Sequence, residues 1–250
     1  MLITIVTVTY NAEGTLERTL KSVEMQTHGN VEHIIMDGAS KDGTLAIAQA
    51  YKERNDDRDI RIVSEPDKGL YDAMNKAIAI AKGEYICFLN AGDKLHNPQT
   101  LEFIVHIAQH NPDAGVIYGD TDIVDDNGMK LRERRLSPPK RLNWRSFKNG
   151  MLVCHQAFYA KRSIVPAYDL SYRFSADFDW CVRIMKKAAT MSMSLVNSHL
   201  TLADYLSEGM TTANHKASLK ERFAIMRKHY GLFTTLAQHA WFFIRALIKK

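Results

Sequence analysis

Three acidic residues follow short apolar segments of this 250-residue chain. Asp37 ends VEHIIMD, Asp120 ends GVIYGD, and Asp93 follows the apolar run of residues 85–89 across a short turn. An apolar run of that length, bounded by turn residues, indicates a strand buried on both faces. Because α/β proteins bind ligands at the carboxyl ends of parallel strands, we expect the three carboxylates on one rim of a sheet rather than as unrelated caps. A carboxylate there, Asp93 above all, suits Mg²⁺ or Mn²⁺, which would in turn neutralise a diphosphate.

A second acidic pair, Asp177 and Asp179, stands at the start of a helix that we expect over residues 177–187. Side chains two residues apart on a helix diverge by about 200°, so only one of them can face a given pocket. One carboxylate is therefore a candidate general base and the other a candidate helix cap. The alternative is that both merely complement the positive end of the helix dipole.

Two further groups carry polar side chains that could bind a sugar or an anion. His155 and Gln156 precede an apolar pair and could bond sugar hydroxyls or a phosphate, although a single histidine can equally be a structural residue. In YLSEGMTT, residues 205–212, Gly209 permits close backbone approach and the hydroxyls could hold an anion. The alternative for that segment is an ordinary turn.

Strands and helices alternate in the first half of the chain. The expected strands are residues 2–10, 31–37, 60–64, 85–89 and 115–120. The segments between them carry apolar residues at helical spacing, as in Leu16, Leu20 and Val23. This alternation predicts the α/β class, with a parallel sheet and helices on both faces. Later elements are expected as a hairpin at 122–135, a short helix at 141–147, strands at 154–159, 191–196 and 200–206, and basic amphipathic helices at 216–229 and 232–248.

Composition limits the function classes. A chain that is 46% hydrophobic can form one large α/β domain, with or without a small appendage. Its three separated cysteines are expected to be packed thiols in a reducing, cytoplasmic compartment, and no Cys/His cluster has zinc spacing. The first ten residues are expected to form a strand rather than a signal peptide, and no apolar stretch reaches the ~20 residues of a transmembrane helix. The net charge of +5 is concentrated late in the chain, which favours an anionic lipid or substrate over a nucleic acid.

Five ordered segments resemble the family 2 glycosyltransferases, enzymes that use nucleotide sugars. They are IVTVTYN (5–11), MDGASKDGT (36–44), GLYDAMN (69–75), GEYICFLNAGD (83–93) and SADFDW (175–180). Their form is similar to the bacterial branch that builds capsular, exopolysaccharide or lipopolysaccharide chains. The resemblance implies a GT-A fold with a Rossmann-like, mostly parallel central sheet over residues 1–212, divided into a nucleotide-sugar half (1–120) and an acceptor half (121–212). The amphipathic basic helices of residues 213–250 would follow as an extension.

The resemblance also implies a donor site in the first half of the chain. Thr9 and Tyr10 would line the nucleobase pocket, and Asp37 would accept a hydrogen bond from N3–H of uracil or an equivalent donor. Asp72 would lie near the nucleotide and the sugar.

A metal site is implied where the family has Asp-x-Asp. Asn90-Ala91-Gly92-Asp93 stands at this position, so Asp93 would bind the ion, Mg²⁺ or Mn²⁺. Asn90 replaces the first acid and offers a neutral oxygen on the donor side. His215 is a further candidate to bind the metal or the phosphates. Thr211 and Thr212 would also contact the phosphates.

The catalytic base is implied at Asp177, which falls on the family's Glu-Asp pair although Ala176 replaces the Glu. The residues expected to contact the acceptor or the sugar are His155, Gln156, Asp179 and Trp180. Together these roles imply an inverting enzyme that moves a sugar from a nucleoside diphosphate, with UDP expected, to a saccharide or a lipid-diphosphate-linked acceptor. Because the helix at 232–248 has an apolar stripe among basic residues, we expect peripheral attachment to an anionic membrane; the alternative is that this stripe packs on the core or on a second subunit.

Two other functions remain open from the sequence. A sugar-1-phosphate nucleotidyltransferase would need a Gly-rich, Arg-containing loop after the first strand, and Asn11-Ala12-Glu13-Gly14 is not such a loop. A degenerate module that binds a nucleotide sugar or serves as a scaffold is suggested by Asn90 and Ala176, whereas the retained Asp93 and Asp177 argue against it. Neither a Gly-x-Gly-x-x-Gly nor a P-loop motif is present, which disfavours dehydrogenases and P-loop enzymes.

Overall fold

The computed structural model describes residues 1–207 and 215–248, apart from the side chains of residues 215 and 246–248. The strands are β1 (Ile3–Thr9), β2 (Val31–Asp37), β3 (Asp59–Ser64), β4 (Tyr85–Phe88), β5 (Lys94–Leu95), β6 (Ala114–Val124), β7 (Lys130–Glu133), β8 (Phe158–Lys161) and β9 (Ser194–Leu206). The helices are α1 (Leu16–Glu24), α2 (Thr44–Glu53), α3 (Leu70–Ile80), α4 (Thr100–His110), α5 (Ala176–Thr190), α7 (His215–Tyr230) and α8 (Leu232–Ile248), with 3₁₀ turns at Trp144–Asn149, His155–Ala157 and Arg162–Ile164.

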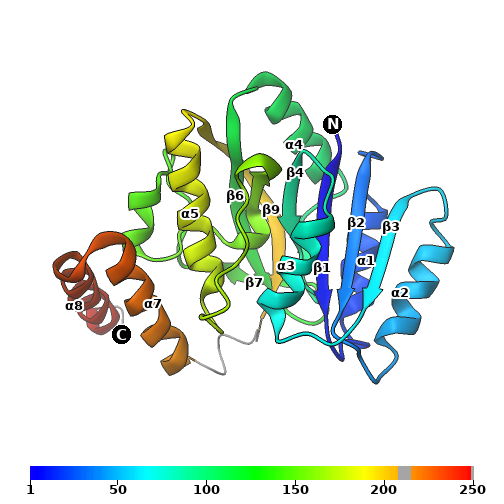
Figure 1. Ribbon diagram of the computed structural model, residues 1–250, viewed down its shortest axis with the longest axis horizontal. Coiled ribbons are helices and arrows are strands. Elements are labelled where there is room, and N and C mark those ends of the chain that lie inside the picture. The colour runs from blue at the N-terminus through cyan, green and yellow to red at the C-terminus, as the bar shows by residue number, and fades with distance from the viewer. Residues whose placement is uncertain (208–214, 249–250) are drawn as a thin grey trace.

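The strands form one mixed sheet in the order β3-β2-β1-β4-β8-β6-β9-β5, with β7 paired to β6 (Figure 1). Neighbours from β3 to β4 are parallel. Because β8 is antiparallel to both β4 and β6, β6 runs in the same direction as β4, and β9 is parallel to β6. The predicted α/β class with a mostly parallel sheet is therefore confirmed.

Helices cover both faces of this sheet, and the alternation of side chains along each strand explains how. Val6 and Val8 of β1 face a core cluster shared with α3, α5 and α7, whereas Ile3 and Ile5 face a cluster shared with α4. α1 and α2 pack over Ile35 of β2. Figure 1 shows α7 and α8 beside α5, at the end of the molecule away from β3.

The later strands differ from the sequence predictions in three places. β6 continues to Val124, so Asp120 lies inside a strand, and the prediction that it ends a strand at the carboxyl rim is wrong. The residues expected to open a separate hairpin belong to β6, which pairs with β7. The strands predicted at 191–196 and 200–206 are one strand, β9, whose register shifts near His199, a residue with φ of 56°. The polar residues there break the apolar pattern without ending the strand, as at a bulge. Segment 154–159 is largely a 3₁₀ turn that leads into β8.

Candidate active site

The chain leaves β4 through a tight turn that brings Asp93 against the sheet. Gly92 has a φ of 100°, and a Cβ on it would lie 2.8 Å from Leu206 Cδ2, so conformation and close approach both require glycine. Thr19 of α1 holds this turn, because its hydroxyl accepts from Gly92 N (2.8 Å) and donates to the Asp93 carbonyl (2.7 Å). Asp93 itself is 4% exposed.

Two donors from distant segments hold the Asp93 carboxylate. Gln156 Nε2 donates to Oδ2 at 2.7 Å, and the backbone N–H of Leu206 donates to Oδ1 at 3.0 Å. Burial raises the pKa of Asp93 to about 6 in spite of these hydrogen bonds. Each oxygen retains a lone pair for one more partner. The buried Gln156, predicted as an acceptor contact, therefore orients the predicted metal ligand.

Asn90 supplies a second oxygen beside this turn. Its Oδ1 atom is buried and finds no hydrogen-bond partner among residues 1–207 and 215–248. A buried amide oxygen without a partner is uncommon, and this one is available to bind a ligand. Together with the Asp93 carboxylate it forms a set of hard oxygen donors, which fits Mg²⁺ or Mn²⁺ completed by water and phosphate oxygens.

Asp177 lies in the first turn of α5, with its side chain largely buried. Its Oδ1 accepts from Phe178 N at 2.9 Å and from the Tyr71 hydroxyl at 3.3 Å, and its Oδ2 lies 3.4 Å from His155 Nδ1. Burial alone would raise its pKa, but the hydrogen bond from His155 and the charge of Arg222 hold the pKa of Asp177 below its ordinary value. The carboxylate is therefore ionised at neutral pH, as a general base must be.

His155 connects the base to the turn after β4. The Asn90 amide nitrogen, Nδ2, lies 3.4 Å from His155 Nε2. Since an amide N–H only donates, Nε2 is the acceptor and Nδ1 carries the proton that faces Asp177. Three separately predicted residues thus form one chain, Asn90–His155–Asp177. Sequence analysis missed Tyr71, although it stands inside the GLYDAMN segment beside Asp72.

The predicted nucleobase residues lie on the same rim. β2, β1 and β4 are adjacent and parallel, so Thr9 and Asp37 end neighbouring strands. The Thr9 hydroxyl is buried and without a partner among the described residues, and Tyr10 is 62% exposed. The Asp37 carboxylate accepts hydrogen bonds from Ser40 and Ser64, which fix its orientation. Asp72 accepts from Lys68 N at 3.0 Å in the first turn of α3.

Comparison with known proteins decides the family. The model of glycosyl transferase family 2 matches residues 4–166, which include the rim and the turn after β4. The chain belongs to glycosyl transferase family 2. A "PGL/p-HBAD biosynthesis glycosyltransferase" of Mycobacterium bovis is 31% identical over 208 residues, which are 82% of this chain and 76% of that protein. An uncharacterized glycosyltransferase of Mycobacterium tuberculosis is 31% identical over 192 residues, which are 72% of this chain and 68% of that protein. This protein is accordingly a glycosyltransferase.

Solved structures show the GT-A fold. Residues 1–349 of S. aureus TarS in complex with UDP-GlcNAc superpose with a TM-score of 0.68 at 17% identity, over 91% of this chain and 65% of that one. A mannosyltransferase of Pyrobaculum calidifontis in complex with GDP-Man and Mn²⁺ superposes with a TM-score of 0.64 at 18% identity, over 95% of this chain and 74% of that one. This chain spans 38% of the longer TarS chain.

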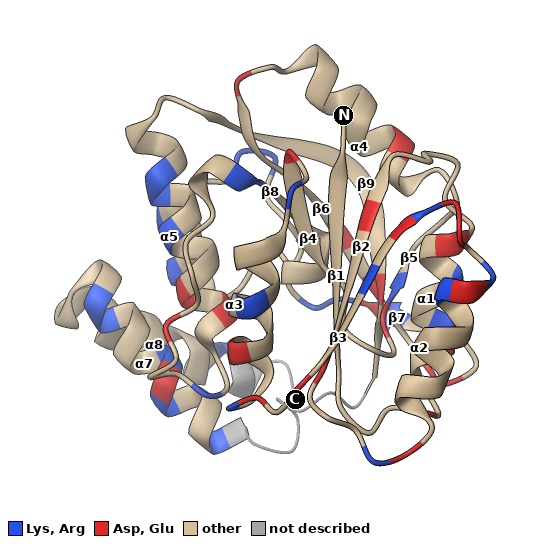
Figure 2. Ribbon diagram, turned by 45° about the vertical axis from the view of Figure 1, so that its right-hand side comes forward, with Lys and Arg blue, Asp and Glu red and all other residues tan. Residues whose placement is uncertain are grey.

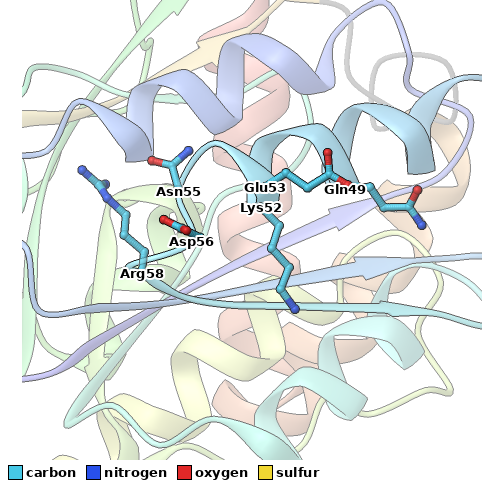
Figure 3. Close-up of a pocket in the computed structure, with 6 residues that line it drawn as sticks. All are labelled: Gln49, Lys52, Glu53, Asn55, Asp56 and Arg58. Atoms are coloured by element: carbon cyan, nitrogen blue, oxygen red, sulfur yellow. The ribbon is translucent and has the colours of Figure 1, made fainter.

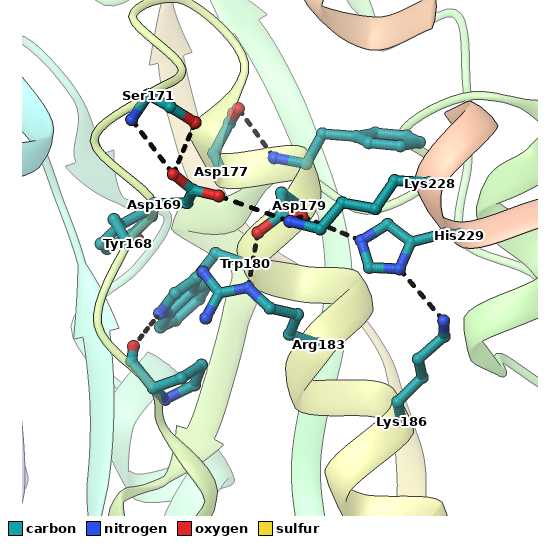
Figure 4. A network of polar contacts seen from close by, with 12 residues as sticks. Tyr168, Asp169, Ser171, Asp177, Asp179, Trp180, Arg183, Lys186, Lys228 and His229 are labelled. Atoms are coloured by element: carbon teal, nitrogen blue, oxygen red, sulfur yellow. Dashed lines mark hydrogen bonds and ion pairs between the residues drawn. The ribbon is translucent and has the colours of Figure 1, made fainter. Parts of the chain in front are cut away.

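Two predicted acceptor contacts of this family 2 enzyme lie in the core instead. Asp179 is fully buried, forms ion pairs with Arg183 and Lys228, and accepts a hydrogen bond from His229 Nε2 (Figure 4). Trp180 is also fully buried, donates to Pro166 O at 2.9 Å and stacks on Tyr168 with ring centroids 4.9 Å apart. Their placement does not support acceptor contacts, because both side chains are fully buried and α5 directs Asp179 away from Asp177.

Other predicted positions fall outside what the structure describes. Gly209, Thr211 and Thr212 lie between the two described ranges, and of His215 only the backbone, at the start of α7, is described. In the described part of the chain, one group of three residues has atoms close enough to share a metal ion: His96, Asp122 and Asp204. Lys130 Nζ already lies 2.9 Å from Asp122, and Lys94 Nζ lies 3.2 Å from Asp204. This group is therefore an ion-pair network that joins β5, β6 and β9.

A surface pocket of about 290 Å³ lies where α2 leads into β3, lined by Gln49, Lys52, Glu53, Asn55, Asp56 and Arg58 (Figure 3). The pocket lies at the amino end of β3, whereas the rim residues stand at the carboxyl ends of β1 and β2. Since α/β ligands bind at the carboxyl ends, this pocket is not the active site.

Proposed function

We propose that the protein is an inverting, metal-dependent glycosyltransferase that moves a sugar from a UDP-sugar to a saccharide or lipid-diphosphate-linked acceptor in cell-surface polysaccharide synthesis. The observation that carries this proposal is the Asn90–His155–Asp177 chain, which links an ionised carboxylate to the turn that presents Asp93. The TarS complex with UDP-GlcNAc supports a nucleotide-sugar donor.

Asp177 would act as the general base. Its Oδ1 is fixed by Phe178 N and Tyr71, while His155 holds Oδ2 by a single longer contact. Oδ2 is thus the atom that would take the proton of the acceptor hydroxyl as the new glycosidic bond forms and the bond to the diphosphate breaks. The two events on opposite sides of the anomeric carbon invert its configuration.

Asp93 and Asn90 would hold the metal ion. When bound, a divalent ion supplies Lewis-acid stabilisation of the departing diphosphate, worth several kcal/mol. Gln156 and Thr19 keep Asp93 in place, because one binds its carboxylate and the other its carbonyl. The mannosyltransferase complex that contains Mn²⁺ supports the use of a divalent ion.

A thermal-shift screen tests the donor site with UDP, GDP, dTDP and CDP, each with Mn²⁺, Mg²⁺ or EDTA. A ligand at 100 times its dissociation constant adds about 2.7 kcal/mol to the unfolding free energy, which raises Tm by roughly 5–11 °C in a chain of this size. We expect that shift with UDP and a divalent ion but not with UDP and EDTA. No shift with any nucleotide would contradict the proposed donor site.

The exposed side of α8 supports attachment to an anionic membrane. Phe233 is 88% exposed, Trp241 52% and Phe243 67%. Basic side chains are frequent on the adjoining α7 (Figure 2). In the described residues, no helix is long and apolar enough to cross a bilayer. An apolar face next to basic residues suits the interface of an anionic membrane.

Vesicle flotation tests this attachment. The protein should float with vesicles that contain phosphatidylglycerol at low salt, and should bind less at high salt because charge attraction is screened. The double variant Phe233→Ser, Phe243→Ser should lose most of this binding. Met25→Ser, which removes a side chain that is 63% exposed at the carboxyl end of α1, should not. Absence of binding to anionic vesicles at low salt would end the membrane proposal.

A further inference from the structure

The segment that leads into α5 is held by a carboxylate from another helix. Ser175 is the N-cap residue of α5, yet its side chain makes no capping hydrogen bond to the helix. Glu221 of α7 accepts from three consecutive backbone N–H groups instead. Its Oε1 lies 2.8 Å from Arg173 N, and its Oε2 lies 2.8 Å from Phe174 N and 2.9 Å from Ser175 N. Hydrogen bonds to an ionised acceptor are roughly twice as strong as those between neutral groups.

Other contacts fasten α7 to the same turn of α5. The hydroxyls of Ser175 and Ser218 lie 2.9 Å apart, and both residues are buried. On the other side of Asp177, Asp179 binds Lys228 Nζ at 3.3 Å and His229 Nε2 at 2.9 Å (Figure 4). Contacts with α7 therefore hold α5 and the segment before it on both sides of Asp177.

We propose that Glu221 is a positioning residue for Asp177, so that α7 forms part of the catalytic apparatus. This inference rests on the proposed role of Asp177 as the base. Catalytic groups must be placed closely, since a misplacement of about 1 Å can cost roughly 10²-fold in rate. Glu221 acts on Asp177 only through the backbone of residues 173–175, which enters α5 two residues before it.

A merely structural role for Glu221 makes a different prediction. Loss of a structural contact lowers Tm without changing the turnover of the molecules that remain folded. Loss of a positioning contact lowers kcat while the KM for the donor stays the same, because the nucleotide rim is formed by β1 and β2. Glu24 offers a matched control, since its carboxylate accepts from Arg54 Nε at 3.2 Å and Asn55 Nδ2 at 2.9 Å between α1 and α2.

The test compares Glu221→Gln with Glu24→Gln in the full chain. Gln at position 221 places an amide NH₂ against backbone N–H donors, so at least one of the three hydrogen bonds is lost. Hydrolysis of UDP-N-acetylglucosamine with Mn²⁺ should show about a tenfold lower kcat for Glu221→Gln, with KM within about twofold. Glu24→Gln should lower Tm but keep kcat. Ser218→Ala, a milder change, should reduce kcat less and in the same direction.

Amide hydrogen exchange provides a measurement that does not need turnover. Glu221→Gln should speed exchange in the peptide that contains residues 173–178, whereas Glu24→Gln should not. Unchanged exchange there, or a kcat equal to that of Glu24→Gln, overturns the positioning role. Asp177→Asn separates the two proposals: if it is inactive while Glu221→Gln is normal, only this inference fails, and if it retains full activity, the proposed base fails as well.

Discussion

Asp177→Asn is expected to lower sugar transfer by about 10²–10⁴-fold, the usual contribution of a positioned general base. Asparagine keeps the shape of the side chain and can still accept from Phe178 N and Tyr71 through its oxygen. It has no ionised oxygen to take the acceptor proton. The lowered pKa of Asp177 means that the wild-type carboxylate is ready for this role throughout the neutral range.

Donor affinity should remain nearly intact in this variant, because the nucleotide would bind at the rim formed by β1, β2 and the turn after β4. The two measurements are kcat for transfer and the Tm shift given by UDP with Mn²⁺. Asp113→Asn is a suitable control, since Asp113 is an exposed residue between α4 and β6. Full transfer activity in Asp177→Asn would refute the assignment of the base.

The rim could be predicted because it depends on local patterns. Apolar runs that end in turn residues identify buried strands, and parallel strands place their carboxyl ends together. This rule puts Asp37 and Asp93 on one edge without any knowledge of the helices. It failed for Asp120, because β6 continues through polar residues that pair with β7 and β9.

Helix periodicity gave less information about the residues around Asp177. It correctly requires Asp177 and Asp179 to point in different directions, but it does not say which direction meets the site. The packing of α7 determines this direction, because Lys228 and His229 bind Asp179 although they lie about fifty residues further along the chain. The carboxylate of Glu221 is likewise separated from Ser175 by 46 residues. No pattern within α5 contains these partners.

Asp93→Asn is expected to abolish the metal-dependent part of nucleotide binding. The variant retains an oxygen for Leu206 N, but it has no charge to attract a divalent ion and places an amide toward Gln156. It should fold, because burial raises the pKa of Asp93 to about 6, which shows that the protein holds the neutral form of this group more readily than water does. Because the pKa of Asp93 is higher in the folded state than its ordinary value, the loss of stability grows as the pH rises from about 4 to about 6 and is complete above pH 6; a neutral side chain avoids that cost.

The pH dependence of nucleotide binding follows from the same pKa. A metal ion must compete with the proton on Asp93 below about pH 6, so the affinity for UDP with Mn²⁺ should fall there by roughly tenfold per pH unit. Asp177 stays ionised in this range because its pKa is lowered, so it does not contribute to the fall. Thermal-shift titrations at several pH values should show this dependence in wild type and in Asp113→Asn. They should show no metal-dependent binding at any pH in Asp93→Asn, and an EDTA-sensitive shift in that variant would place the metal on other residues.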